Sequence, residues 1–246
     1  MNSTAQYEFT ILVPVYNEDD RLQKFFMALD SYKENTKRHF CVLFVNDDST
    51  DKSLSMIRDY CMRMRDCFYI SLMQRTGLSG TIKAGISRVH SEYVGYIDPG
   101  LQTRPVDFEL LFQKAHDSAM VCGERDFSSV PFYSHLWVRV CALARRLVTG
   151  DAMSDVSCPL RLGRTEVLKQ LPWFSGIHSY VPALVKMSGN RVTTVRVNFN
   201  RRARPGRVRR QMFGGTAAGV CNLFVFMWMR RRFLDPAVSD SNLQGR

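Results

Sequence analysis

The residues of this sequence that are best suited to chemistry are carboxylates that directly follow short apolar runs. Asp47 and Asp48 follow the run 40–46, and Asp98 follows the run 93–97. A carboxylate in such a place could accept a hydrogen bond from a nucleobase N–H, or it could hold a divalent cation, because hard cations such as Mg²⁺ prefer oxygen ligands. Chemistry of this kind would bring a nucleotide and a metal ion to the same part of the protein.

Each of these carboxylates also has a purely structural interpretation. Asp and Ser residues before a helix cap its free N–H groups, which accounts for some of the polar residues in 46–51. Asp98 is followed by Pro99 and Gly100, and on spacing alone this sequence favours a turn in which the aspartate bonds the backbone. A metal site at Asp98 would need a second oxygen ligand, and the side chain of Gln102 could supply it.

Apolar runs alternate with helical patterns in the first half of the chain. We expect strands at 9–16, 40–46, 67–73, 93–97 and 119–123, and helices at 19–35, 49–64, 78–89 and 104–117. Ser49 or Thr50 is the expected N-cap of the second helix. The alternation predicts an α/β fold with a mostly parallel central sheet that is flanked by helices on both faces.

Sheets of this kind bind ligands at the carboxyl ends of their strands, so the residues at and just after the end of each strand form the candidate site. They are Pro14, Tyr16, Glu18, Asn46, Asp47, Asp48, Gln74, Arg75, Asp98, Glu124 and Arg125. Tyr16 and Glu18 could flank a base and its ribose. Neither GxGxxG nor GxxxxGK[ST] follows the first strand, which argues against a dinucleotide-binding site and against a P-loop.

The second half of the chain is less regular. We expect a helix at 134–150, a strand-like piece within 153–164 and a strand within 189–199, followed by an arginine-rich loop and a final helix. We interpret the chain as a single domain with a nucleotide-binding half at 9–125, an acceptor half at 126–210 and a C-terminal helix at 211–234.

The basic residues are concentrated late in the chain. The 246 residues carry a formal net charge of +11, with six arginines in 201–210 and three at 230–232. This excess favours a polyanionic partner, and the guanidinium group matches phosphate oxygens well. Nucleic acid is not the expected partner, because no nucleic-acid-binding module is visible and no aromatic residues alternate with the arginines of 201–210.

Three further features concern location. Residues 213–229 carry no charge but are short for a membrane crossing, so we expect a helix that is packed on the domain or lies in a membrane interface. The seven cysteines form no CxxC pair, which is typical of core residues in a reducing compartment. The first residues lack the features of a signal peptide. The expected location is cytoplasmic, peripheral on the cytoplasmic face of the membrane.

Three motifs carry a resemblance to a known family. The segments "ILVPVYNE", "FVNDDSTDKS" and "YIDPGLQTRPVDF" occur in this order and at intervals that resemble the first strand, the second-strand aspartate motif and the DxD-type motif of family 2 glycosyltransferases with the GT-A fold. The resemblance is nearest to polyprenyl-phosphate sugar transferases of the dolichyl-phosphate mannose synthase type. It extends over residues 9–234 and is looser after residue 125, where "DVSCPLRLGRTEVL" and "GNRVTTVRVNFNRRARPGR" carry it.

The resemblance implies a donor site at the strand ends. The residues that would line the donor nucleotide are Pro14, Tyr16, Glu18, Asn46, Asp47 and Asp48, of which Asp47 would bind the base. Asp98 and Gln102 would bind Mg²⁺ or Mn²⁺ together with the donor diphosphate.

The resemblance also implies catalytic and phosphate-binding residues. Asp98, Asp155 and Arg125 are the expected catalytic residues. Asp155 would lie near the transferred sugar, and Arg125 would approach the donor or acceptor phosphate. Arg161 follows in the same motif as Asp155 and is a further expected binding residue, and Arg202 and Arg204 would contact phosphates.

The sequence departs from the family pattern at some of these positions. Gly100 stands where the family places the second aspartate of its DxD motif, Asp48 stands where glycine is usual, and Pro159 also replaces a usual glycine. Two functions remain open. One is an inverting glycosyltransferase that moves a sugar from a GDP- or UDP-linked donor to a polyprenyl phosphate at the membrane surface, or to a glycan. The other is a protein that binds nucleotide or nucleotide sugar without turnover, because a carboxylate is missing from the metal site.

Overall fold

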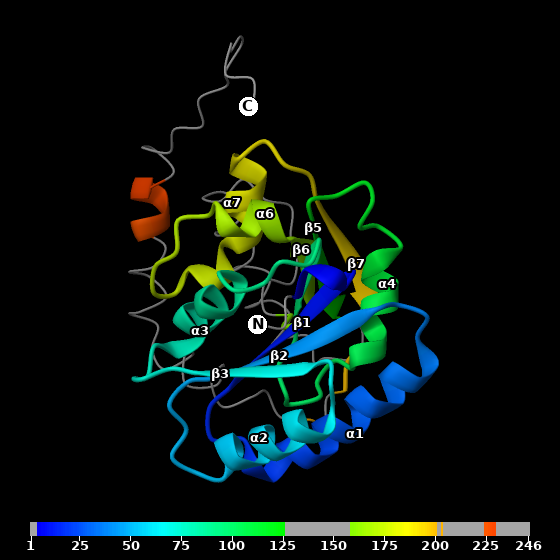
Figure 1. Ribbon diagram of the computed structural model, residues 1–246. Coiled ribbons are helices and arrows are strands. Elements are labelled where there is room, and N and C mark those ends of the chain that lie inside the picture. The colour runs from blue at the N-terminus through cyan, green and yellow to red at the C-terminus, as the bar shows by residue number, and fades with distance from the viewer. Residues whose placement is uncertain (1–3, 126–157, 201–202, 204–223, 230–246) are drawn as a thin grey trace, which may run out of the picture.

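A computed structural model describes residues 4–125, 158–200, 203 and 224–229 (Figure 1). The strands are β1 (Phe9–Val15), β2 (Phe40–Asn46), β3 (Cys67–Ser71), β4 (Tyr93–Tyr96), β5 (Met120–Arg125), β6 (Arg161–Arg164) and β7 (Val192–Val197). The α-helices are α1 (Asp19–Asn35), α2 (Ser53–Arg63), α3 (Gly77–Ile86), α4 (Phe108–Phe112), α6 (Thr165–Lys169) and α7 (Val181–Met187). The 3-10 helices are η1 (Thr4–Gln6), η2 (Pro105–Asp107) and η3 (Ile177–Ser179).

The strands form one sheet in the order β3-β2-β1-β4-β6-β5-β7. β1 is parallel to β2 and β4, β2 is parallel to β3, and β5 is parallel to β7. β6 alone among these strands is antiparallel to its neighbours, β4 and β5. The prediction of a mostly parallel sheet is confirmed, and the strand-like piece expected within 153–164 supplies the antiparallel strand.

Helices cover both faces of the sheet, as Figure 1 shows. Because successive strand residues point to opposite faces, Ile11 and Val13 of β1 join a core with α1, α2 and α4, whereas Leu12 joins a second core with α3, α6 and α7. Helix α3 packs very closely on β1. A Cβ atom on Gly85 would lie 2.0 Å from Cδ1 of Leu12, so a larger residue at position 85 would force the Leu12 side chain or the helix to shift.

Two predicted helices differ from those observed. The second helix begins at Ser53 rather than near residue 49, and its N-cap residue is Lys52, without a side-chain capping bond. The prediction that Ser49 or Thr50 caps this helix is therefore wrong. Ser49 and Thr50 form hydrogen bonds with Asn17 in the loop after β1 instead. The helix expected at 104–117 is shorter and consists of η2 followed by α4. The helix predicted at 134–150 lies outside the described residues.

A short helical stretch, residues 224–229, is described near the end of the chain. The buried Phe226 ring stacks on Tyr180 at 4.9 Å, while Phe224 and Trp228 are 64% and 61% exposed. The described helices include none that combines the length and hydropathy needed to span a bilayer.

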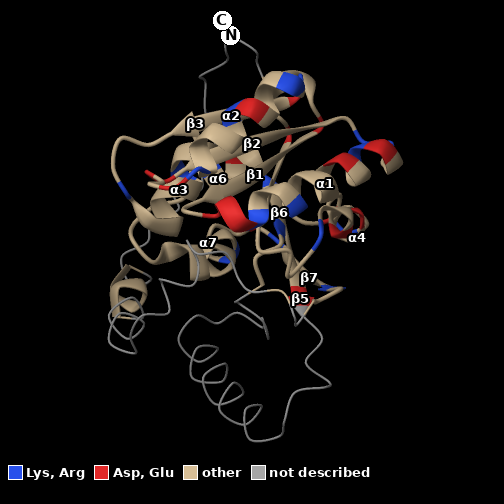
Figure 2. Cartoon of the chain, turned by 90° about the horizontal axis from the view of Figure 1, so that it is seen from below, with Lys and Arg blue, Asp and Glu red and all other residues tan. Residues whose placement is uncertain are grey.

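The described surface carries both signs of charge. Figure 2 shows acidic and basic residues together on α1. The nine arginines of 201–210 and 230–232 fall outside the described residues, and these two sequence segments contain no acidic residue. The excess positive charge of the chain is therefore concentrated in two short segments rather than spread over the helices.

Candidate active site

Backbone strain marks the carboxyl edge of the sheet. The non-glycine residues with positive φ in the described part of the chain are Asn17 (53°), Asp48 (58°) and Leu101 (53°). They lie in the loops that follow β1, β2 and β4, which are neighbours in the sheet. Left-handed backbone is costly for residues other than glycine, and strained positions of this kind cluster at functional sites. The strain thus falls at the edge where the sequence places the candidate residues.

The loops after β1 and β2 are fastened to each other. Oδ1 of Asn17 accepts the backbone N–H of Thr50 at 2.8 Å, and Oγ of Ser49 accepts the backbone N–H of Asn17 at 3.0 Å. Oγ of Ser53 accepts the backbone N–H of Glu18 at 2.8 Å. The hydroxyl groups of Ser49 and Ser53 therefore hold the loop after β1 in place.

Asp51 completes this junction at the start of α2. Its carboxylate accepts the backbone N–H groups of Ser53, at 2.9 Å, and Asp19, at 3.2 Å. Burial alone would raise the pKa of the Asp51 carboxyl, but hydrogen bonds from Ser53 and Asp19 outweigh it and keep that pKa below its usual value. These hydrogen bonds give Ser49, Asp51 and Ser53 structural roles. The nucleotide contacts expected of Asn46, Asp47 and Asp48 stay predictions.

Asp47 is fully buried and caps α3 rather than α2. Its Oδ1 accepts the backbone N–H of Thr76 at 2.7 Å and the Thr76 hydroxyl at 2.9 Å, and its Oδ2 accepts the backbone N–H of Gly77 at 2.9 Å. A carboxylate at a helix N-terminus is further stabilised by the helix dipole. Oδ2 can accept a second hydrogen bond, so it has an acceptor position that a nucleobase N–H could use.

Asn46 precedes Asp47 in the chain, and one atom of its side-chain amide forms a hydrogen bond. Its Nδ2 donates to Oγ of Ser71 at 2.9 Å, at the end of β3. Its Oδ1 is buried and has no hydrogen-bond partner among the described residues. A buried acceptor without a donor costs stability, so a donor supplied by a ligand or a water molecule would be favourable here.

Pro14 and Glu18 have clear structural roles. β1 pairs with β4 only up to Leu12, so Pro14 lies past the β4 ladder, where its missing N–H does no harm. Pro14 is the second-last residue of β1. Glu18 is fully buried, and its carboxylate pairs with Arg21 at 2.9 Å across the first turn of α1. The expected contacts of Pro14 and Glu18 with a nucleotide stay predictions.

Tyr16 has a neighbour to which the sequence assigned no role. The guanidinium carbon of Arg75 lies 4.1 Å from the centre of the Tyr16 ring. Arg75 is exposed and follows β3, while Tyr16 follows β1 and is half-buried. The sequence places Arg75 among the strand-end residues, and the structure adds that it directly precedes the Thr76–Gly77 pair that Asp47 holds.

The loop after β4 forms the turn expected from its sequence. Oδ1 of the buried Asp98 accepts the backbone N–H of Gly100 at 2.8 Å. Nε2 of Gln102 donates to the carbonyl of Ala203 at 3.3 Å, and the Gln102 carbonyl accepts the backbone N–H of Asn200 at 2.9 Å. The candidate metal loop is therefore joined to the segment at which the arginine-rich loop begins.

A further contact strengthens this junction. Asp107 is buried, and its Oδ1 accepts a hydrogen bond from Nδ2 of Asn198 at 3.3 Å, just after β7. Its Oδ2 accepts the backbone N–H of Arg104 at 2.8 Å. Burial raises the pKa of the Asp107 carboxyl. Gln102 and Asp107 thus both join this loop to the chain that follows β7.

The residues present fit a weakly held divalent cation. No group of three or more His, Cys, Asp or Glu residues able to hold a metal occurs in the described part of the chain. Asp98 and Gln102 would supply one carboxylate and one amide oxygen, and the hydrogen bond from Nε2 of Gln102 does not prevent its oxygen from acting as a ligand. Mg²⁺ retains several waters and is commonly bound through one or two carboxylates plus substrate phosphates, so a diphosphate could complete such a site.

The predicted residues of the second half are only partly described. Arg161 is buried in β6, beside the end of β4, and its guanidinium donates to the carbonyl of His178. His178 is itself held by Oγ of Ser79 in α3, 3.0 Å from its Nδ1. Arg125 ends β5. Asp155, Arg202 and Arg204 lie outside the described residues.

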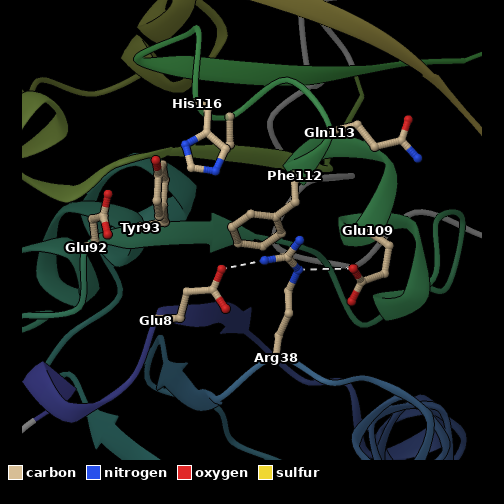
Figure 3. A pocket seen from close by; sticks show the side chains of 9 residues that line it. Glu8, Arg38, Glu92, Tyr93, Glu109, Phe112, Gln113 and His116 are labelled. Atoms are coloured by element: carbon tan, nitrogen blue, oxygen red, sulfur yellow. Dashed lines mark hydrogen bonds and ion pairs between the residues drawn. The ribbon is translucent and has the colours of Figure 1, made fainter.

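Two hollows, of about 360 and 500 Å³, lie at the amino ends of the strands, away from these residues. Figure 3 shows Arg38 at the centre of the first, directed toward Glu8 and Glu109. Arg38 forms ion pairs with both carboxylates, the second at 3.0 Å, and its guanidinium lies 3.7 Å from the centre of the Phe112 ring. Arg38 thus joins the starts of β1 and β2 to α4, which is a structural role.

The left-handed backbone at Asp48 gives a testable consequence. We expect Asp48→Gly to raise the free energy of unfolding by about 0.5–1 kcal/mol, because relief of the left-handed strain exceeds the entropic cost of glycine. Urea denaturation measures the change. Asp48→Ala is the matched comparison and should be destabilising, since alanine keeps a Cβ but loses the tolerance of aspartate for this conformation. A glycine variant less stable than the native protein would contradict the explanation.

Comparison with known proteins shows the family of this chain. Residues 10–172 match the family model described as Glycosyl transferase family 2. The undecaprenyl-phosphate 4-deoxy-4-formamido-L-arabinose transferase of Edwardsiella ictaluri (strain 93-146) is 25% identical over 196 residues, which cover 78% of this chain and 60% of that protein. The corresponding protein of Enterobacter sp. (strain 638) is 26% identical over 204 residues, covering 80% and 61%. The chain thus spans about 60% of the length of these relatives.

Solved structures share the fold. Glucosyl-3-phosphoglycerate synthase from Mycobacterium tuberculosis, in complex with Mn²⁺, UDP-glucose and phosphoglyceric acid, superposes with a TM-score of 0.64 at 15% identity, covering 93% of this chain and 81% of that one. The mannosyltransferase PcManGT from Pyrobaculum calidifontis, in complex with GDP-Man and Mn²⁺, gives a TM-score of 0.56 at 16% identity, covering 80% and 58%. The fold is that of the GT-A glycosyltransferases, and by its match over 10–172 the chain belongs to glycosyl transferase family 2.

Proposed function

We propose that this protein transfers a sugar, with inversion, from a GDP- or UDP-linked donor to a polyprenyl phosphate. The observation that carries the proposal is the junction of the Asp98–Gln102 loop with Asn200 and Ala203. It brings the candidate ligands of a cation and a diphosphate next to the start of a segment with six arginines. The relatives named above, which act on undecaprenyl phosphate by their names, support an acceptor of this class.

Each residue in the proposed site has a chemical task. Tyr16, Asn46 and Asp47 bind the base, and Asp98 and Gln102 hold Mg²⁺ or Mn²⁺. When bound, that ion neutralises the charge that develops on the departing nucleoside diphosphate. Positioning and charge stabilisation are then the main contributions of the protein.

The acceptor determines whether a base is needed. A polyprenyl phosphate is already anionic, so its oxygen can attack the anomeric carbon without losing a proton to the protein. Arg125, Arg161, Arg202 and Arg204 would hold its phosphate and that of the donor. A glycan acceptor would attack through a hydroxyl group and would require a general base, for which Asp155 is the candidate.

We also propose that the protein acts at the cytoplasmic face of a membrane. Phe224 and Trp228 expose apolar rings on the described helical stretch, and three arginines follow at 230–232. Aromatic rings at the interface and arginines on lipid phosphates are the usual components of peripheral binding. This placement would bring the protein to a lipid-linked acceptor.

A second function is favoured by Gly100, where a carboxylate would be expected. Its N–H group completes the turn with Oδ1 of Asp98, so the loop keeps its shape without a second aspartate. A protein of this kind would bind the nucleotide without turnover. The observation that separates the two functions is metal dependence combined with product formation.

A thermal-shift screen followed by a transfer assay tests the proposal. We expect UDP or GDP at about 100 times its Kd to raise the Tm by about 5–10 °C with Mn²⁺ present, because binding to the folded state adds about 2.7 kcal/mol. Transfer from the matching nucleotide sugar to a short polyprenyl phosphate should then be detected. Binding that ignores Mn²⁺, without any transfer, would establish the non-catalytic function. Absence of both binding and transfer would overturn both functions.

A further inference from the structure

The Arg75 guanidinium covers one face of the Tyr16 ring. The guanidinium carbon lies 4.1 Å from the centre of the Tyr16 ring. Planar groups at this spacing are in contact, so a nucleobase cannot enter between them. One of the two groups must move before a base can use this face of Tyr16.

The position of Arg75 is fixed by its neighbours. Asp47 accepts hydrogen bonds from the backbone N–H groups of Thr76 and Gly77, the two residues that follow Arg75. The backbone at this point is therefore anchored to the end of β2. The Arg75 side chain is exposed, which allows it to leave the ring without breaking the fold.

We infer that Arg75 covers the base-stacking face of Tyr16 in the empty protein and moves onto the donor diphosphate when the base takes that face. The inference rests on the proposed function. Stacking of a base on an aromatic ring is stronger than an exposed cation–π contact, so the base displaces the guanidinium. The displaced guanidinium then gains charge-assisted hydrogen bonds to phosphate oxygens, for which its geometry is suited.

This double role makes an unusual prediction, because one substitution should have opposite effects on two ligands. Uridine or guanosine has a base but no phosphate, so Arg75→Ala removes only the competitor and should tighten nucleoside binding about two- to five-fold. UDP or GDP also loses a phosphate partner, so its affinity should fall about ten-fold or more. A residue that merely supports the loop would weaken both.

The experiment measures the Kd of the nucleoside and of its diphosphate by NMR titration, with the base chosen by the screen above. Arg58→Ala is the matched control, because Arg58 is an exposed arginine whose guanidinium carbon lies 5.8 Å from the Tyr69 ring centre, on α2 and β3. It should leave both Kd values unchanged. Tyr16→Leu should weaken the nucleoside and remove the gain caused by Arg75→Ala.

The outcomes separate this inference from the function on which it rests. Opposite changes in the two Kd values support the inference. Equal weakening of both ligands by Arg75→Ala, or no change in either, overturns it while leaving nucleotide binding established. A native protein that binds no nucleoside diphosphate overturns the inference and the proposed function together.

Discussion

Replacing Asp98 by asparagine is expected to lower kcat for sugar transfer by about 10²–10³-fold, the range found when one preorganised electrostatic contact is removed from an active site. Asparagine keeps an oxygen that can accept the N–H of Gly100, so the turn should persist. It removes the negative charge that would hold the cation. Initial rates over a Mn²⁺ titration measure the effect, and the Tm reports whether the fold is retained.

Two further variants control this experiment. Asp59→Asn removes an equal charge from an exposed position on α2 and should leave the rate unchanged. Gly100→Asp restores the second carboxylate and should lower the Mn²⁺ concentration required for half-maximal activity, since each added carboxylate ligand strengthens cation binding. Gly100 does not have a positive φ, so the backbone admits an aspartate there. If the Asp98→Asn protein had the native rate and the native Mn²⁺ dependence, Asp98 would not be a ligand of the cation.

The second large effect is expected at Asp47. Asp47→Ala should lower the free energy of unfolding by about 2–4 kcal/mol, because three donors at the start of α3 lose their shared acceptor and the helix dipole loses its anion. Asp47→Asn keeps one acceptor oxygen and should cost about 1–2 kcal/mol. Both should also weaken nucleotide binding, since Asp47 presents the segment that carries Arg75. Urea denaturation gives the stabilities, and titration with UDP or GDP gives the affinities.

The adjacent residue provides the matched control for this prediction. Asp48→Asn makes the same chemical change one residue later, at an exposed side chain, and asparagine tolerates the left-handed backbone of that position. Its stability should stay within about 0.5 kcal/mol of the native value. If Asp47→Asn and Asp48→Asn were equally mild, the capping bonds described for Asp47 would have no energetic weight.

The comparison of Asp47 and Asp48 also shows a structural feature that sequence patterns do not predict. Both aspartates follow the same strand, and the family resemblance treats Asp48 as a departure from glycine. The structure gives a backbone reason for both residue types at this position, because position 48 has a φ of 58° that glycine adopts most easily and aspartate tolerates. A backbone angle of this kind cannot be seen in the sequence alone.

The sequence by itself determined the framework of the protein. Buried strands alternate with amphipathic helices, and this pattern is sufficient to predict a mostly parallel sheet, because parallel strands need helical crossovers between them. It also determined that Tyr16, Asp47 and Asp98 come to one edge, since parallel strands end on the same side. These predictions depend on periodicity and chain direction, which are properties of local sequence.

Only the tertiary structure decided what these residues contact. Asp47 bonds Thr76 and Gly77 rather than the helix that follows it, Gln102 bonds Ala203, and Arg161 reaches the end of β4 through an antiparallel strand. Each of these contacts joins segments that are distant in the chain, and each depends on which strands are neighbours in the sheet. Local propensity carries no information about that order, because it is set by the packing of the whole sheet against its two layers of helices.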